Sequence, residues 1–177
     1  SADTVTQIRI GYPILNHVDN QAFLVSDNEE KTRSLLPLTI RNGLVNSTIN
    51  SQNHLSIILP ENQNILRWDS VENIEITPAS RLQNPVLSDD SLQIHFDVIG
   101  SWSSQDSVEI QNIQLKGFTE IFDHSWIHLS ADGTTNYNMA NARSLNSLRV
   151  GDTQINLTSH QAYTIGDTLG RVQGSLH

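Results

Sequence analysis

The stretch Leu92-Gln93-Ile94-His95-Phe96-Asp97-Val98 decides the fold class of this chain. Its apolar residues occupy every second position, and each gap between them holds one polar residue. Successive side chains of a β-strand point to opposite faces of a sheet, whereas a helix returns to the same face every three or four residues. The alternation therefore predicts a strand with one buried face and one solvated face.

The same two-residue pattern recurs along the chain between turn-forming residues. We expect further strands at residues 4–12, 36–40, 55–59, 65–68, 74–76, 107–118, 122–129, 154–157 and 163–165. Asn42-Gly43 predicts a tight hairpin, because both residues tolerate a positive φ. Pro78 and Pro85 are expected to bound a loop.

The strand expected at 107–118 contains an irregularity. Val108 and Ile110 share one face of a regular strand, and Ile113 and Leu115 share the other. One extra residue near Gln111-Asn112 would bring all four side chains to the same face, as a β-bulge does. We therefore predict a bulge there.

About eight to ten short strands with frequent turns predict an all-β fold, an antiparallel β-sandwich. Met139 to Val150 alone has a helical alternative, because Met139, Ala142, Leu145 and Leu148 recur every third residue. The fold is thus expected to contain at most one short helix. We expect residues 1–34 to form an N-terminal strand and a polar arm, and residues 35–177 to form the sandwich domain.

The composition excludes several classes of partner. The chain has 177 residues, a net charge of −9 and no cysteine. Nucleic acid and anionic membranes attract Lys and Arg, so neither is an expected partner. No apolar run has the length of a membrane-spanning helix. Scarce Lys and the small-residue start Ser1-Ala2 favour an exported protein, extracellular or at the cell surface, whose signal peptide has been removed.

The sequence shows no motif for catalysis, so we expect no enzymatic activity. His124 and His128 could bind a metal, but on a strand they lie roughly 13 Å apart, too far to hold one ion. We expect no cofactor. Calcium is the open alternative, because residues 88–90 and 132–136 carry suitable oxygens, although hairpin turns use the same residue types.

Tryptophan suggests a ligand-binding alternative, since flat aromatic rings stack on sugar faces. Trp68 lies beside apolar residues and is expected in the core. Trp102, between Gly100 and Asp106, is expected to be exposed on a loop, and Trp126 is the second possible platform for a glycan.

The N-terminal strand suggests self-association. Its expected pairing face consists of Thr4, Thr6, Ile8, Ile10 and Tyr12. Such a strand can pair within its own sheet, or it can add to the sheet of a second copy, where backbone hydrogen bonds give affinity and alternate side chains fill pockets. Repetition of that head-to-tail contact builds an open filament.

One part of the chain resembles a known class. The resemblance lies in Leu38-Thr39-Ile40, Leu55 to Pro60, Trp68-Asp69, Ser91 to Ile94 and Asp106 to Phe118. These segments, within roughly residues 36–118, resemble cohesin-like and immunoglobulin-like β-sandwich modules of bacterial surface proteins. The resemblance implies an immunoglobulin-like or jelly-roll-like sandwich that serves as a scaffold or adhesive unit, and it supplies no catalytic residue.

Two functions follow as expectations. The first is a non-catalytic extracellular structural subunit that self-associates into a filament by exchange of its N-terminal strand. The second is a carbohydrate- or ligand-binding module of a surface protein.

Overall fold

The computed structural model describes residues 13–26, 28–43, 49–52, 54–60, 66–133 and 140–152. Within these ranges the chain forms fifteen β-strands and no helix. The all-β prediction is therefore confirmed. The strands expected at 4–12, 154–157 and 163–165 lie outside the described residues.

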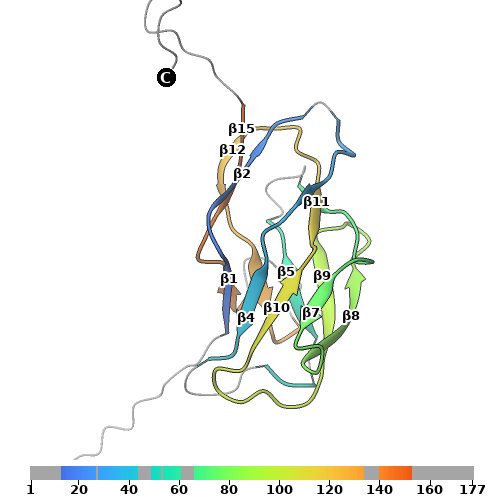
Figure 1. Cartoon of the computed structure of the whole chain (residues 1–177), viewed down its shortest axis with the longest axis vertical. Helices are drawn as coiled ribbons and strands as arrows, with labels where there is room; N and C mark the ends of the chain where they lie inside the picture. Colours follow the sequence, from blue (N-terminus) through green and yellow to red (C-terminus); the bar gives the residue numbers. More distant parts are fainter. Residues whose placement is uncertain are drawn as a thin grey trace, which may run out of the picture.

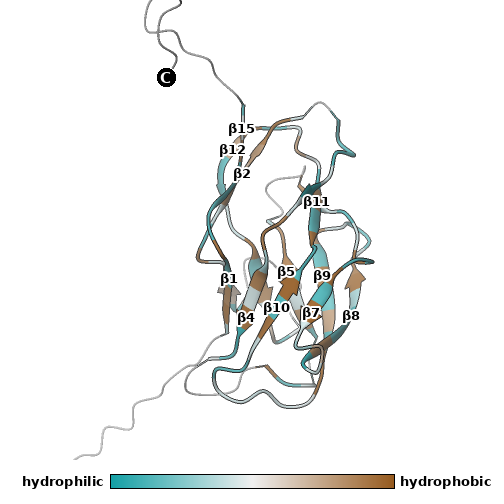
Figure 2. Ribbon diagram, viewed as in Figure 1, coloured by the Kyte–Doolittle hydropathy of each residue, from teal (hydrophilic) through white to brown (hydrophobic). Residues whose placement is uncertain are grey.

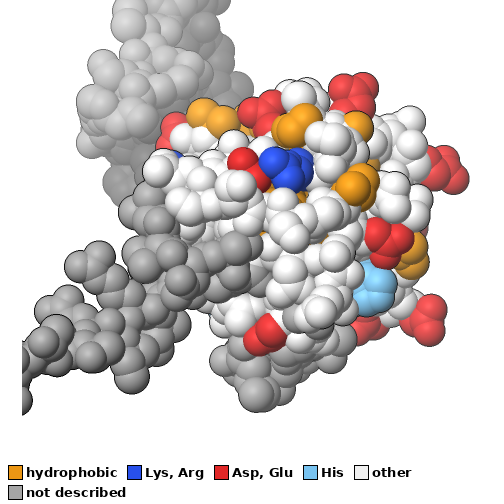
Figure 3. All heavy atoms as spheres, turned by 90° about the horizontal axis from the view of Figure 1, so that it is seen from below, with side chains coloured by type: hydrophobic (Ala, Val, Ile, Leu, Met, Phe, Trp, Pro, Cys, Tyr) orange, Lys and Arg blue, Asp and Glu red, His pale blue; other side chains and the backbone are white. Residues whose placement is uncertain are grey.

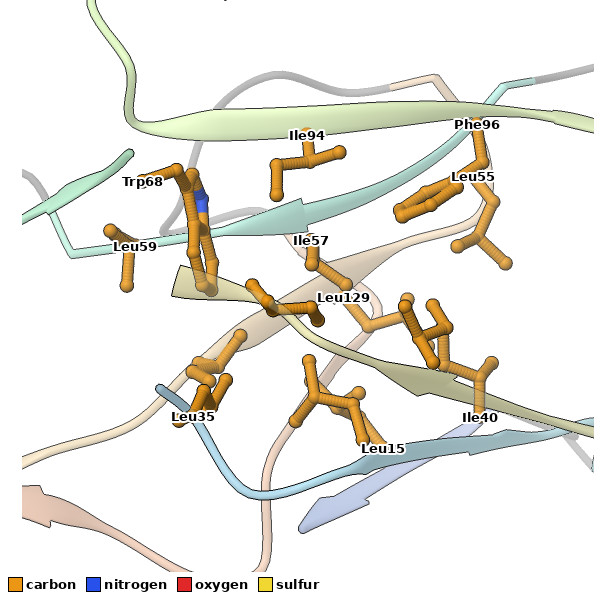
Figure 4. Close-up of a cluster of buried hydrophobic side chains, with 14 of the residues drawn as sticks. Leu15, Leu35, Ile40, Leu55, Ile57, Leu59, Trp68, Ile94, Phe96 and Leu129 are labelled. Atoms are coloured by element: carbon orange, nitrogen blue, oxygen red, sulfur yellow. The ribbon is translucent and has the colours of Figure 1, made fainter. Parts of the chain in front are cut away.

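Two larger sheets face each other across the core (Figures 1 and 4). The four-stranded antiparallel sheet has the order β1 (Ile14–His17), β4 (Leu38–Arg41), β10 (Ser107–Gln111), β7 (Glu75–Thr77). The five-stranded antiparallel sheet has the order β14 (Ala142–Arg143), β13 (His128–Ser130), β5 (Leu55–Ile58), β9 (Gln93–Val98), β8 (Leu82–Leu87).

Two three-stranded sheets extend the fold along its long axis (Figure 1). One has the order β3 (Arg33–Ser34), β11 (Gln114–Lys116), β6 (Arg67–Trp68). The other has the order β12 (Phe122–Ser125), β15 (Leu148–Gly151), β2 (Gln21–Leu24). Among the named strands of the described chain, only β2 and β15 pair in parallel.

The core is built by the alternation that the sequence shows. Ile94 and Phe96 of β9 are fully buried, while His95 and Asp97 lie partly exposed on the outer face. Ile57 of β5 and Leu129 of β13 extend this apolar layer, and Leu15 and Ile40 meet it from the four-stranded sheet (Figure 4). Figure 2 shows the resulting succession of hydrophobic and hydrophilic residues along the strands. Burial of each such side chain contributes about 1.5–3 kcal/mol, so this layer is the main source of stability.

The outcome expected near Gln111-Asn112 is observed, because the apolar side chains before and after these two residues are buried. Val108, Ile110, Ile113 and Leu115 are all buried. The structure achieves this by ending β10 and starting β11 in a different sheet, with Asn112 at a φ of 60°. The chain therefore passes from one sheet to another at this point. The predicted bulge within a single strand is wrong.

Two turn predictions are wrong. β4 pairs with β1 on one side and β10 on the other, so Asn42-Gly43 cannot form a hairpin with the segment that follows it. Pro85 lies inside β8, not at the end of a loop, and the register shifts between Gln83 and Val86. Proline is tolerated there because β8 is an edge strand with a local bulge.

The helical alternative at Met139 to Val150 is also wrong for its described part. Residues 142–143 and 148–151 form β14 and β15, and no helix lies between them in the described range 140–152. Met139 itself lies outside the described residues. Backbone pairing with β13 and β12 overrides the three-residue periodicity.

The boundary expected between residues 34 and 35 does not divide the described chain. β1, β2 and β3 pair with β4, β15 and β11, so residues 14–34 belong to the same sheets as the rest. Phe23 is only 8% exposed and packs against Phe118, with ring centroids 4.8 Å apart. Most of the polar residues that suggested an arm occupy turns and exposed positions, but His17 is buried in β1 at 1% exposure.

Candidate functional site

Trp102 does not offer a platform. Its side chain is 1% exposed and belongs to the core, so the exposure expected from the sequence is wrong. The amide of Asn42 explains this placement, because it donates to the backbone carbonyls of Trp102 (3.2 Å) and Ser103 (3.1 Å) and holds the loop against the sheet. Trp68 is fully buried, as expected.

Trp126 is half-buried, in the turn between β12 and β13. The guanidinium carbon of Arg143 lies 4.9 Å from the centre of its ring, and the ring of His124 stacks at 6.2 Å. Arg143 thus lies against the Trp126 ring and covers part of the surface on which a sugar ring would stack. His124 and His128 lie on strands of two different sheets, and His124 contacts the Ser147 hydroxyl at 3.1 Å.

The predicted pairing strand, Thr4 to Tyr12, lies outside the described residues, but the structure shows where it joins the fold. A groove of about 400 Å³ opens beside Pro13, between the edges of the two larger sheets. We call this groove the β1–β14 seam; it is lined by Pro13, Ile14, Asn141, Ala142, Arg143 and Leu145.

The β1–β14 seam is a loosely closed edge. A parallel bridge, Leu15 to Ser144, joins the two sides, and beyond it Asn146 donates its amide to the side-chain oxygen of Asn16 at 3.3 Å and to the His17 carbonyl. Further along this edge, Nε2 of His17 lies 2.9 Å from the Asn146 carbonyl, and the backbone N–H of Gln21 donates to the Ser147 carbonyl at 3.0 Å. Leu145, in contrast, remains 72% exposed at the seam.

A second candidate site lies on the outer face of the five-stranded sheet. Its groove measures about 300 Å³ and is lined by His54, Asn84, Val86, His95 and Asp97. We call it the histidine groove. A further hollow of about 290 Å³ shares His54 and Asp97 with it.

Strand pairing assembles the histidine groove. His95 lies opposite Ser56 in the β5–β9 register, and its Nδ1 lies 2.7 Å from the Ser56 hydroxyl. Nδ1 of His54 lies 3.2 Å from Oδ1 of Asp97. Asn84 donates its amide to Oδ2 of Asp97 at 2.9 Å. Each oxygen of the Asp97 carboxylate therefore contacts another segment of the chain. His54 directly precedes β5, and Asn84 lies in β8.

The electrostatics of the groove keep His95 uncharged near neutral pH. Partial burial lowers the pKa of His95, and the nearby His54 lowers it further, against an opposing effect of Asp90. Desolvation disfavours the charged imidazolium, and a neighbouring cation adds repulsion. His95 thus acts as a neutral hydrogen-bonding group.

The turns considered for calcium use their carboxylates internally. Asp90 accepts hydrogen bonds from Ser88 and from the backbone N–H of Leu92, which lower its pKa in that order. Asp132 accepts from Ser130 and Asn141. In the described ranges no three His, Cys, Asp or Glu residues come together to hold a metal ion.

A third groove, of about 460 Å³, is lined by charged residues that include Glu29, Glu30 and Lys116. Lys116 lies 3.2 Å from Glu30 and 3.8 Å from Asp69. This charge is therefore already paired, and the groove is best explained as an ion-pair network that holds the turn at residues 29–30 onto β11.

Comparison with known proteins gives no assignment: no family model, no curated protein and no solved structure matches this chain. No helix in the described parts of the chain is long and apolar enough to cross a membrane.

The sequence pattern predicts neither groove, although it contains part of the information. The alternation in 92–98 places His95 and Asp97 on the face opposite Ile94 and Phe96. The contribution of residues 54–56 depends on strand order, which the sequence does not reveal. The seam depends on how two sheet edges meet, which is again a long-range property.

Proposed function

We propose that this protein is a non-catalytic extracellular structural subunit that self-associates, with its N-terminal strand, Thr4 to Tyr12, pairing in the β1–β14 seam of a neighbouring copy. The observation that carries the proposal is the seam itself. It is a mainly apolar groove where the edges of the two larger sheets meet, and the strand predicted from the sequence joins the described chain at Pro13, one of its lining residues.

The chemistry of the seam suits an added strand. β1 pairs along its length with β4, while on its opposite side the described chain provides one β-bridge, at Leu15, and the side-chain amide of Asn146, which donates to the His17 carbonyl. An extended segment could supply backbone hydrogen bonds at this edge, and its alternate side chains could contact Ile14, Ala142 and Leu145. Ile8 and Ile10 provide apolar side chains with this two-residue spacing.

The length of the segment allows exchange between copies. Twelve residues precede Pro13, and an extended chain of that length reaches at most roughly 40 Å. A segment of this length can therefore reach the seam of a neighbouring copy. Because the donor strand and the acceptor seam are different surfaces, the contact is head-to-tail, and it generates an open filament where the rotation between copies does not close a ring.

The non-catalytic part of the proposal is supported by the burial of the serine hydroxyls that contact histidine. Ser56, beside His95, is 2% exposed, and Ser147, beside His124, is 7% exposed. A serine nucleophile must reach its substrate and needs a positioned base. These two pairs instead act as hydrogen bonds that fix neighbouring strands.

Deletion of residues 1–12 tests the proposal. Electron micrographs and sedimentation velocity of the full chain should show polymers, and the deletion should leave folded monomers. Addition of a synthetic peptide with the sequence of residues 1–12 should bind these monomers. Polymers that persist after deletion would contradict strand exchange.

The acceptor side has a matched control. Leu145→Asp places a charge in the seam and should abolish assembly, because the ion would lose hydration in an apolar contact. Val18→Asp changes a side chain of nearly equal exposure, 73% against 72% for Leu145, that does not line the seam. The Val18 variant should assemble normally; equal loss in both variants would argue against the seam as the acceptor.

A further inference from the structure

We propose that the histidine groove binds a short, uncharged saccharide on the outer face of β5, β8 and β9. This site differs from the tryptophan platforms expected from the sequence. It also lies apart from the β1–β14 seam and shares no lining residue with it.

Asp97 supplies an oriented acceptor at the centre of the groove. His54 holds one carboxylate oxygen at 3.2 Å and Asn84 holds the other at 2.9 Å. A carboxylate has about four lone-pair positions, so each oxygen can accept another hydrogen bond. Two hydroxyls on adjacent carbons of a sugar match this planar pair of acceptors.

Backbone geometry fixes the partner of Asp97. Asn84 has a φ of 48° at the irregular step of β8, where the register shifts between Gln83 and Val86. Asparagine adopts this left-handed conformation more readily than most residues other than glycine, and here it turns the chain at the irregular step. The step directs the Asn84 amide to Asp97 and leaves the Asn84 side-chain oxygen as an additional acceptor.

Charge selects a neutral ligand. The carboxylate of Asp97 already faces His54, and the whole chain carries a net charge of −9, which repels anions. A metal ion is disfavoured because no sufficient set of His, Cys, Asp or Glu ligands forms among the described residues. Hydroxyl groups can both donate to Asp97 and accept from an imidazole, without a net charge.

The shape and apolar content of the groove suit a sugar ring. Val86 is 57% exposed at the groove and offers a surface for the C–H face of a ring. The groove and the adjoining hollow measure about 300 and 290 Å³. Single ligand pockets begin at about 300 Å³, so a ligand of one or a few rings fits better than a long polymer.

The full chain should first be screened on an array of neutral and acidic oligosaccharides, and the neutral ones then titrated while amide resonances are followed by NMR. We expect shifts centred on His54, Asn84, Val86, His95 and Asp97. Absence of any such shift with neutral saccharides at about 10 mM, a concentration that detects even millimolar binding, would overturn the proposal. Preferential binding of acidic sugars, of Zn²⁺ or of a peptide at these residues would also overturn it.

Three variants locate the site. Asp97→Ala should weaken binding about tenfold or more, which corresponds to about 1.4 kcal/mol. Val86→Asp should weaken binding by a similar factor without removing a hydrogen bond inside the protein. Because the Val86 side chain is exposed, this variant should fold normally. Asp123→Ala removes an exposed carboxylate of β12, outside the groove, and should bind normally.

Undiminished binding in both groove variants would contradict the assignment. The seam variant Leu145→Asp should retain saccharide binding, so failure of strand exchange and failure of this site are distinguishable.

Discussion

Two buried tryptophans differ in one hydrogen bond. The indole N–H of Trp68 donates to the Leu92 carbonyl at 3.0 Å. The indole N–H of Trp102 is buried and has no hydrogen-bond partner. Since both side chains are at most 1% exposed, their packing losses on shortening should be similar. The difference in hydrogen bonding between the two indole N–H groups should therefore decide which substitution lowers the free energy of unfolding more.

We predict that Trp68→Phe destabilises the protein by about 1–3 kcal/mol more than Trp102→Phe. Trp68→Phe removes a satisfied hydrogen bond, whereas Trp102→Phe removes a donor that is already unpaired in the folded state. Urea unfolding of the two variants, followed by fluorescence of the remaining tryptophans, measures the difference. Equal losses, or a larger loss for Trp102→Phe, would contradict the argument.

The burial of a side chain can be predicted from the sequence where the residues next to it in the chain determine that burial. Trp68 adjoins Leu66 and falls in an apolar strand, so its burial follows from local pattern. Trp102 lies between polar residues, and its burial depends on hydrogen bonds from Asn42, which is distant in the sequence. The same holds for Asp97, whose partners His54 and Asn84 come from other segments of the chain.

The connection between β10 and β11 depends on a left-handed residue. Asn112 is exposed and has a φ of 60°, and it lets buried side chains continue on both sides of the break. Asparagine tolerates this conformation, but a β-branched side chain does not. The residue type at this position is thus set by backbone geometry and not by contacts.

We predict that Asn112→Val lowers the free energy of unfolding by about 1–2 kcal/mol, the cost of the left-handed conformation for an ordinary residue. Asn112→Gly is the matched control, because glycine adopts this φ without steric cost. Chemical denaturation of both variants provides the test. A valine variant as stable as the glycine variant would show that the backbone at this break relaxes freely.

At the scale of elements, alternation predicted most strands but not their partners. The strands expected at 55–59 and 92–98 are β5 and β9, within one residue at each end. Their pairing with each other, and the placement of Pro85 on the edge strand β8, follow from strand order in the sheet. Two-residue periodicity fixes which face is buried, and it contains no information on which strand lies alongside. That missing information is what assembles the seam and the groove.

The whole molecule carries an excess of negative charge that opposes contact between copies. The net charge is −9, and acidic side chains are scattered over the face shown in Figure 3, where little Lys or Arg is visible. The proposed seam contact, in contrast, is mostly apolar: Pro13, Ile14, Ala142 and Leu145 line it beside Asn141 and a single charged residue, Arg143. Assembly should therefore be driven by burial of apolar surface and opposed by long-range repulsion.

Salt should separate these two contributions. The screening length falls from about 30 Å at 0.01 M to about 8 Å at 0.15 M ionic strength, so added NaCl removes repulsion between copies and leaves apolar burial in place. We predict that the polymer fraction at pH 7, measured by sedimentation velocity, rises over this range of salt. Leu145→Asp should stay monomeric throughout, because its seam is blocked whatever the screening. A polymer fraction that falls with salt would mean that ion pairs hold the copies together, and the seam contact would then be the wrong one.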